Sequence, residues 1–277
     1  MKAGRTTQFW MQAGTKFLPF ADAATKELPL SRLLRLSLFQ VSVGMAAVLL
    51  TGTLNRVMIV ELGMSASAVA TMVSLRLLFP PLRGMIGHKS DNHRSLLGWK
   101  RVPYIWFGTL LQFGGFAILP FALLVMSGGG QGPAFSGQIA AALAFLFIGA
   151  GMHTTQTAGL ALATDLATDE TRPRVVALLY VMLLLGMMIS ALVFGQLLKD
   201  FSATRLVQIV STVSVLTVVL NIIALWKQEA RNRGATTARD NAPSFKQVWK
   251  IFIARPKTMR LLVSVGLGSA AFSMQDG

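Results

Sequence analysis

Long apolar runs separated by short charged turns constrain this sequence more than any other feature. A helix needs about 20 mostly apolar residues to cross the hydrocarbon core of a bilayer. Six runs reach that length, and a seventh begins near Met259. We therefore predict membrane-spanning helices at about 33–54, 65–86, 102–126, 137–162, 175–198 and 204–226.

The composition supports a membrane protein and excludes several other classes. Hydrophobic residues make up 53% of the 277 residues and charged residues only 13%, against about 25% charged in a soluble domain. The net charge is +15, but the basic residues flank apolar runs, which favours membrane orientation and anionic lipids over nucleic acid. The absence of cysteine excludes disulfides and zinc–thiolate sites.

The basic residues are distributed unevenly between the two sides of the predicted helices. The loops predicted on the outer side contain only Arg56, Lys199 and Arg205. Most other Lys and Arg residues lie before the first run, between the second and third runs, or after the sixth. Because short basic loops stay on the cytoplasmic side, we predict a multi-pass protein with a cytoplasmic N-terminus.

Four segments follow from this pattern. They are a cytoplasmic tail at 1–30, a six-helix bundle at 31–226, a basic cytoplasmic linker at 227–257 and the start of a seventh helix at 258–277. In the tail, Phe9 and Trp10 belong to an aromatic pattern of near-helical spacing. The tail is either an amphipathic helix on the membrane surface or a loose polar segment. A second candidate surface helix surrounds Trp249 in the linker.

The predicted loop between the second and third helices is short and strongly basic. Its spacing resembles, in stretched form, the corresponding loop of the major facilitator superfamily, in which an Asp and basic residues stabilise one conformation. The matching residues here are Gly87, Asp91, Arg94, Gly98, Lys100 and Arg101. We expect Asp91 to accept backbone N–H groups or to pair with an arginine of the turn after the fourth helix. Alternatively, the loop is solvated and only sets orientation, since Asn92 stands where the superfamily usually has Arg.

Three stretches resemble a narrower family. They are SDNHRSLLGWKRVPYIWFG at 90–108, GAGMHTTQTAGLALATDLATDETRPRVVALLY at 149–180 and the closing FSMQDG. Together they resemble the PucC/LhaA family of light-harvesting complex assembly proteins of purple phototrophic bacteria. The resemblance implies an all-α membrane bundle of the major facilitator type. It also implies twelve helices in the full protein, of which six and part of a seventh are expected here, so the chain is a fragment, a truncation or a short form.

The resemblance implies a non-enzymatic role in assembling LH1 or LH2 antenna around the photosynthetic reaction centre, in the intracytoplasmic part of the bacterial inner membrane. Expected partners are the light-harvesting α and β polypeptides, the reaction centre, lipids and pigment-synthesis enzymes, with bacteriochlorophyll as cofactor and no free metal. Small residues are expected to let the lipid-facing side approach antenna helices. These residues are Gly108, Gly114, Gly115, Gly149 and Gly151.

Two observations bear on other functions. The sequence shows no nucleophile–base pair, phosphate-binding glycine loop or Asp-rich prenyl-diphosphate motif, so we do not expect an enzyme. The alternative function is a secondary transporter of a small amphiphilic or anionic solute. No acidic residue lies in the middle of a predicted helix, which counts against a proton antiporter.

A polar run interrupts the fourth predicted helix. His153, Gln156 and Thr157 recur at i, i+3 and i+4, so they share one face. The resemblance makes His153 Nε2 a candidate axial ligand of the bacteriochlorophyll magnesium, with Gln156 and Thr157 beside it. The alternative is an interhelical hydrogen bond, which stabilises a membrane bundle by about 0.6–2 kcal/mol.

Other charged residues admit two interpretations each. Arg76 lies midway along the second predicted helix, and it is either a clamp for a substrate anion or a structural anchor. As an anchor it would pair with backbone carbonyls or a carboxylate, of which Asp165 is nearest in type. His88 and His93 resemble a metal pair, but their spacing in a basic loop favours solvated side chains. The turn that contains Asp169, Arg172 and Arg174 is expected to form local ion pairs.

Overall fold

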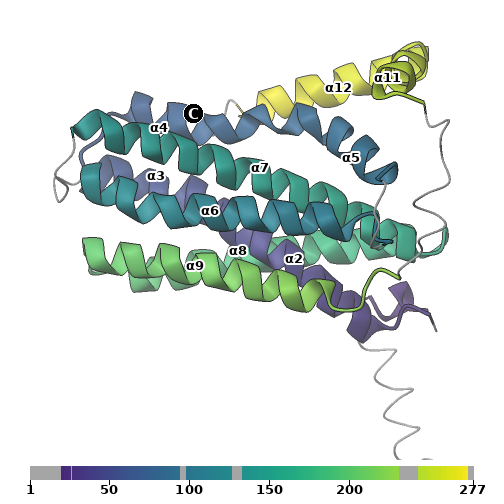
Figure 1. The fold of residues 1–277 in the computed structure, drawn as a ribbon, viewed down its shortest axis with the longest axis horizontal. Helices are drawn as coiled ribbons and strands as arrows, with labels where there is room; N and C mark the ends of the chain where they lie inside the picture. The colour runs from purple at the N-terminus through teal and green to yellow at the C-terminus, as the bar shows by residue number, and fades with distance from the viewer. Residues whose placement is uncertain (1–19, 26, 94–97, 127–132, 231–242, 274–277) are drawn as a thin grey trace, which may run out of the picture.

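The computed structural model describes residues 20–25, 27–93, 98–126, 133–230 and 243–273, and within these ranges it contains helices and no strand (Figure 1). The tail helix predicted around Trp10 lies outside the described residues. In chain order the helices are η1 (Ala21–Ala23), α2 (Leu30–Val48), η2 (Leu49–Thr53), α3 (Leu54–Arg56), η3 (Val57–Glu61), α4 (Ala66–Ser74), η4 (Leu75–Leu78), η5 (Pro80–Leu82), α5 (Arg83–Asp91), α6 (Val102–Met126), α7 (Ala134–Leu166), α8 (Arg172–Leu197), α9 (Ala203–Leu225), α11 (Phe245–Ile253) and α12 (Pro256–Ser273).

Within the described part of the chain, five helical stretches are long and apolar enough to cross a membrane. They are Leu30–Glu61, Val102–Met126, Phe135–Leu166, Arg172–Leu197 and Ala203–Leu225. They run alongside one another in a bundle, and large apolar side chains such as Phe121 and Leu192 are exposed on its outside (Figure 1). An exposed apolar belt is expected where lipid is the solvent. The predicted third to sixth spans are confirmed to within a few residues.

The first span is longer than predicted. A turn was expected from Asn55, but the helix continues through α3 and two π-helical turns, η2 and η3, to Glu61. Val57 and Met58 are buried in the core, so an earlier turn would expose apolar surface. The chain turns only after Leu62, where Gly63 has a φ of +61°.

The predicted second span, at 65–86, is not a single helix. It is divided among α4, η4, η5 and α5, with a break at Phe79 followed by Pro80 and Pro81. Proline lacks the backbone N–H that continues an α-helix, which explains the break. α5 then continues to Asp91, so Gly87 and Asp91 lie on a helix and not in the loop predicted there.

α6 and α7 pack closely because small residues face each other. A Cβ atom added at Gly108 would lie 2.7 Å from the Gly151 carbonyl oxygen, and one at Gly151 would lie 2.7 Å from the Gln112 nitrogen. Gly115 meets Ala144 and Ile148 of α7, and Gly149 meets Arg76. The expectation that these four glycines face antenna helices is therefore wrong. Only Gly114, of the five, borders open space.

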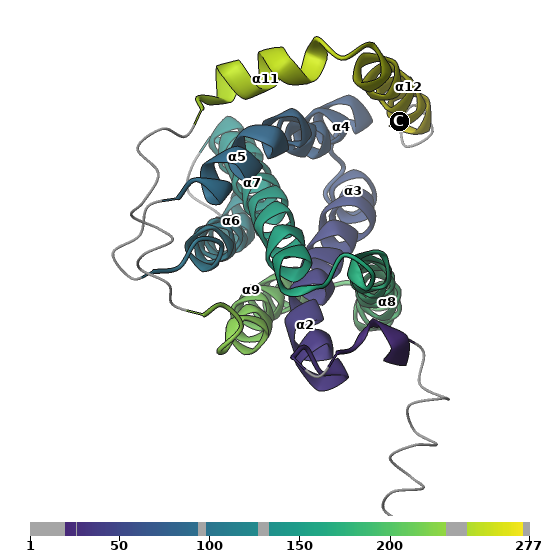
Figure 2. The same cartoon turned by 90° about the vertical axis from the view of Figure 1, so that its right-hand side faces the viewer.

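α11 lies crosswise to the bundle, at the end where α2 begins (Figure 2). Ser244 and Gln247 form a capping box at its start, and the exposed side chains of Trp249 and Phe252 stack with ring centroids 5.7 Å apart. Phe245 contacts the ring of His88 on α5. The helix predicted around Trp249 is confirmed, and its place on a membrane surface stays a prediction.

Candidate functional site

One end of the bundle, where α2, α6 and α8 begin and α5, α7 and α9 end, gathers most of the described ion pairs (Figure 1). We call it the basic end. Among the described residues, it includes Arg32, Arg101, Arg172 and Arg174, which lie in segments predicted to be cytoplasmic. Which side of a membrane the basic end faces stays a prediction.

Arg101 is the centre of the basic end, and only 5% of it is exposed. Its Nε donates to Asp165 Oδ2 at 3.0 Å, its Nη1 to Ser90 Oγ at 2.6 Å, and its Nη2 pairs with Asp91. One guanidinium thus joins the end of α5, the start of α6 and the end of α7. Burial acts to lower the pKa of Arg101, but the carboxylates of Asp165 and Asp91 raise it above its usual value, so the side chain stays charged.

This arrangement corrects the expected partner of Asp91. Asp91 pairs with Arg101, not with an arginine of the turn after α7. Arg172 instead pairs locally with Asp169 at 2.8 Å, as expected of that turn, while Arg174 reaches Asp22 at 3.1 Å.

Asp165, the carboxylate nearest in type, is not the partner of Arg76. The backbone of Arg76 packs on Gly149, which lies about 24 Å along α7 from Asp165 at the usual helical rise. Asp165 therefore cannot reach Arg76.

The segment that follows α9 closes the basic end, a contact that the sequence analysis missed. The Glu229 carboxylate accepts hydrogen bonds from the backbone N–H groups of Lys100 at 2.6 Å, Arg101 at 3.0 Å and Val102 at 2.9 Å. A carboxylate there satisfies donors that a helix start leaves free and opposes the helix dipole. Beside it, fully buried Gln228 exchanges hydrogen bonds with Arg32 at the start of α2.

Replacing Glu229 with alanine should lower the free energy of unfolding by about 1–2 kcal/mol, because three N–H groups at the start of α6 lose a charged acceptor. Thermal unfolding of the detergent-solubilised protein measures the effect. Glu170→Ala is the control, since the Glu170 side chain is exposed and makes no hydrogen bond or ion pair with another described residue. Equal melting temperatures for the two variants would contradict the capping role.

The polar face of α7 meets α5 and α2 further inside the bundle. Arg83 Nε donates to Thr157 Oγ1 at 3.2 Å, and its Nη2 donates to Gln156 Oε1. Gln156 Nε2 in turn donates to Gln40 of α2 at 3.3 Å. Gln156 and Thr157 thus both bind Arg83, a partner that the sequence did not point to.

His153 lies one turn before Thr157 and is half-buried. Its ring is hydrogen-bonded to the backbone of Arg76, and its Nδ1 is buried without a hydrogen-bond partner in the described part of the chain. The nitrogen available for a ligand is therefore Nδ1, whereas the sequence analysis named Nε2. Because Nδ1 is buried, a ligand would reach it only after neighbouring side chains move.

The remaining motif residues occupy separate positions. Gly98 is buried with a φ of +78°, and Lys100 meets Glu229 through its backbone, while Arg94 lies outside the described residues. His88 packs on Phe245 and His93 packs on Tyr104, so the two rings have different neighbours. Among the described residues no group of three or more His, Cys, Asp or Glu side chains could hold a metal ion.

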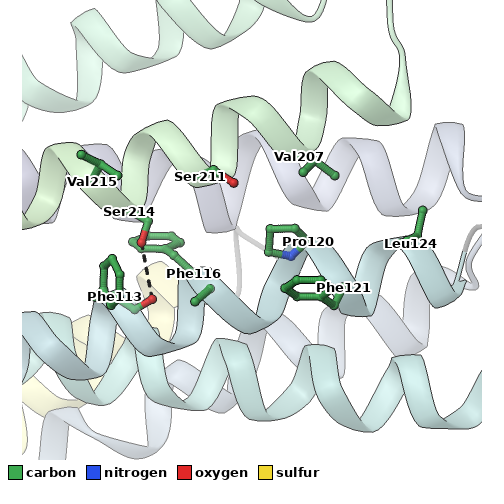
Figure 3. Close-up of a pocket in the computed structure, with 10 residues that line it drawn as sticks. Phe113, Phe116, Pro120, Phe121, Leu124, Val207, Ser211, Ser214 and Val215 are labelled. Atoms are coloured by element: carbon green, nitrogen blue, oxygen red, sulfur yellow. Dashed lines mark hydrogen bonds between the residues drawn. The ribbon is translucent and has the colours of Figure 1, made fainter. Parts of the chain in front are cut away.

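Several cavities lie between α6 and α9, and two of them concern the site. An apolar cavity of ≈ 360 Å³ is lined by aromatic residues that include Phe113 and Phe121, and Ser214 donates to the Phe113 carbonyl beside it (Figure 3). A second cavity of ≈ 610 Å³ lies at the basic end, and we call it the tryptophan groove. Its lining includes Trp99, Trp106, Trp226, Arg32, Lys227 and Glu229.

Fold and site together define a multi-pass, all-helical membrane protein whose basic end is joined by ion pairs and hydrogen bonds. The chain belongs to the PUCC protein family, whose family model matches residues 53–277. It is 58% identical to Protein PucC of Rhodovulum sulfidophilum over 95% of this chain and 59% of the relative. It is 55% identical to Protein PucC of Rhodobacter capsulatus over 94% of this chain and 58% of the relative.

A more distant relative is named Bacteriochlorophyll synthase 44.5 kDa chain, from Rhodobacter capsulatus. It is 28% identical over 88% of this chain and 55% of the relative. The chain thus spans between 55% and 59% of the length of these relatives. No solved structure matches it.

Proposed function

We propose that this chain acts without catalysis in assembling bacterial light-harvesting antenna around the photosynthetic reaction centre. Family membership carries the proposal, because the PUCC family is the one that the motifs at 90–108 and 149–180 resemble. The name of the distant relative refers to bacteriochlorophyll, which agrees with a role in photosynthesis. We further propose that the bundle corresponds to the N-terminal half of a facilitator-type protein, with the basic end in the cytoplasm.

The tryptophan groove suits such a role. It is bordered by α6 and α9, and Trp226 at its edge is 60% exposed. Indole rings combine a large apolar face with a polar N–H, so they suit the boundary between lipid and water. Arg32 and Lys227 add positive charge to the groove. We propose that the polar end of an antenna polypeptide docks there, with its helix alongside the exposed Phe113 and Phe121.

His153 is the proposed contact to bacteriochlorophyll. The unpartnered Nδ1 of a neutral imidazole fits the need of a magnesium ion for an electron-pair donor, and Gln156 and Thr157 hold the same face of α7 in place. When bound, the pigment supplies near-infrared absorption. The residues of this chain would only hold and release it.

The test is to purify the tagged protein from phototrophic membranes in mild detergent, record its near-infrared spectrum and identify the chains that accompany it. We expect antenna polypeptides and bacteriochlorophyll absorbance, with the absorbance lost in His153→Ala. His93→Ala is the matched control and should keep the pigment, since the His93 ring packs on Tyr104. Pigment retained in His153→Ala would refute the ligand role and leave the assembly role standing.

Export or flipping of a small amphiphilic or anionic solute is the second candidate function. The observation that favours it is the polar face of α7, where Arg83 donates to Gln156 and Thr157 and where Arg76 packs on Gly149. A colourless protein without antenna partners would favour this function over assembly. Loss of solute flux in Arg76→Gln would then support it.

A further inference from the structure

Arg83 offers a partly used guanidinium inside the bundle. Its Nε and Nη2 are bound by Thr157 and Gln156 of α7. Its Nη1 has no hydrogen-bond partner among the described residues. This nitrogen is not fully buried, so another molecule can reach it. One edge of the guanidinium is therefore held by protein, while the edge formed by Nη1 and the second hydrogen of Nη2 remains for another acceptor.

Neutral groups hold this guanidinium in a defined orientation. The Thr157 hydroxyl donates its own proton to the His153 carbonyl at 2.7 Å, so its oxygen lone pairs are left for Arg83. Because Arg83 only donates, Gln156 must turn its oxygen toward Arg83 and its nitrogen toward Gln40. Gln40 is fully buried between the helices, which fixes the far end of this chain of hydrogen bonds.

No carboxylate in the described part of the chain pairs with Arg83. Asp91 lies at the other end of α5, about 12 Å away along the helix axis, and Asp165 lies about 13 Å along α7 from Gln156. Both carboxylates are already bound to Arg101. A half-buried arginine of a membrane protein is unfavourable without an anionic partner, and such residues usually mark functional sites.

We propose that Arg83, oriented by Gln156 and Thr157, binds an oxyanion, that is, a carboxylate or phosphate group. The free edge of the guanidinium presents two N–H groups in the fork that such groups accept as a pair of hydrogen bonds. The site shares Gln156 and Thr157 with the face of α7 that carries His153, but its ligand binds to Arg83, and it does not depend on the assembly role. The oxyanion belongs either to a free solute or to the headgroup of an anionic lipid.

The first experiment titrates inorganic phosphate into the whole purified chain in an uncharged detergent, at constant ionic strength, while thermal unfolding is followed. Phosphate should raise the melting temperature to a plateau. Arg83→Gln should raise the half-saturating concentration at least tenfold, and Arg83→Lys should lie between, because an ammonium keeps the charge but lacks the fork. Arg205→Gln is the control, since Arg205 lies at the opposite end of α9 from the basic end beside Asp200 and should leave the titration unchanged.

The second experiment identifies the source of the oxyanion. The protein is placed in phosphatidylcholine nanodiscs with and without phosphatidylglycerol. If phosphatidylglycerol stabilises the protein only when Arg83 is present, and phosphate has no effect in detergent, the ligand is a lipid headgroup. If phosphate stabilises the protein through Arg83 and phosphatidylglycerol does not, the ligand is a free anion. If neither probe depends on Arg83, or if Arg205→Gln weakens binding equally, the proposal is overturned.

A variant that keeps the arginine tests the proposal even if Arg83→Gln does not fold. Thr157→Val removes the acceptor that orients Nε while preserving side-chain shape and the positive charge. The half-saturating phosphate concentration should rise at least threefold. An unchanged titration in a folded Thr157→Val protein would refute the orienting role that the proposal requires.

Discussion

Replacing Gly151 with alanine should lower the free energy of unfolding by about 2–3 kcal/mol, the range expected when a well-packed contact is overfilled. The added Cβ would overlap the Gly108 carbonyl and lie 2.7 Å from the Gln112 nitrogen. Both are backbone atoms of α6, so a side-chain rotation cannot relieve the overlap and the two helices must separate. Thermal or denaturant unfolding in detergent measures the loss.

Gly114→Ala is the matched control on α6. A Cβ there meets nothing within 4 Å, so stability should be unchanged or rise by about 0.5–1 kcal/mol, because alanine favours the helix over glycine. If Gly151→Ala and Gly114→Ala melted at the same temperature, the close approach of α6 and α7 would be disproved.

Replacing Arg101 with methionine should destabilise the bundle by about 2–3 kcal/mol and loosen the basic end. The change removes three charge-assisted hydrogen bonds between α5, α6 and α7. The full penalty for breaking a buried pair is not expected, because the side chains of Asp91 and Asp165 are 56% and 50% exposed and can regain water. Faster hydrogen exchange at the end of α5 and the start of α6 should accompany the loss in thermal stability.

A double-mutant cycle isolates the ion pairs from the packing of the side chain. Asp165→Asn alone should be destabilising, and its effect should shrink when Arg101 is already methionine. Arg172→Ala serves as the comparison, since its pair with Asp169 is exposed and contributes less than about 1 kcal/mol. Additive effects of the Arg101 and Asp165 changes would rule out the central role of Arg101.

Local features of the chain were predictable. The spans at 102–126 and 204–226 follow from hydropathy alone, since each needs only a run of apolar residues of sufficient length. The start of the fifth span was predicted at 175, within three residues of Arg172, where α8 begins. The end of the first span was missed, since Arg56 suggested a loop although its neighbours are buried.

The partners within the candidate site were not predictable. Arg101 and Asp165, or Glu229 and the start of α6, are far apart in the chain, and no local pattern links them. Sequence reasoning found Asp91, Arg101, Gln156 and Thr157 as residues of interest but gave Asp91 the wrong partner and overlooked Arg83 and Glu229. A free carboxylate just after the sixth span was the only signal that could have pointed to Glu229.

The sequence by itself determined that this is a multi-pass helical membrane protein of the PUCC family, and which of its loops are basic. Only the tertiary structure decided which face of each helix is buried. The reason is physical: apart from the polar run of α7, the spanning helices are apolar on nearly every side, so their composition does not indicate how each is rotated about its axis. That rotation turns Gly108 and Gly151 toward each other and brings Arg83 to Gln156.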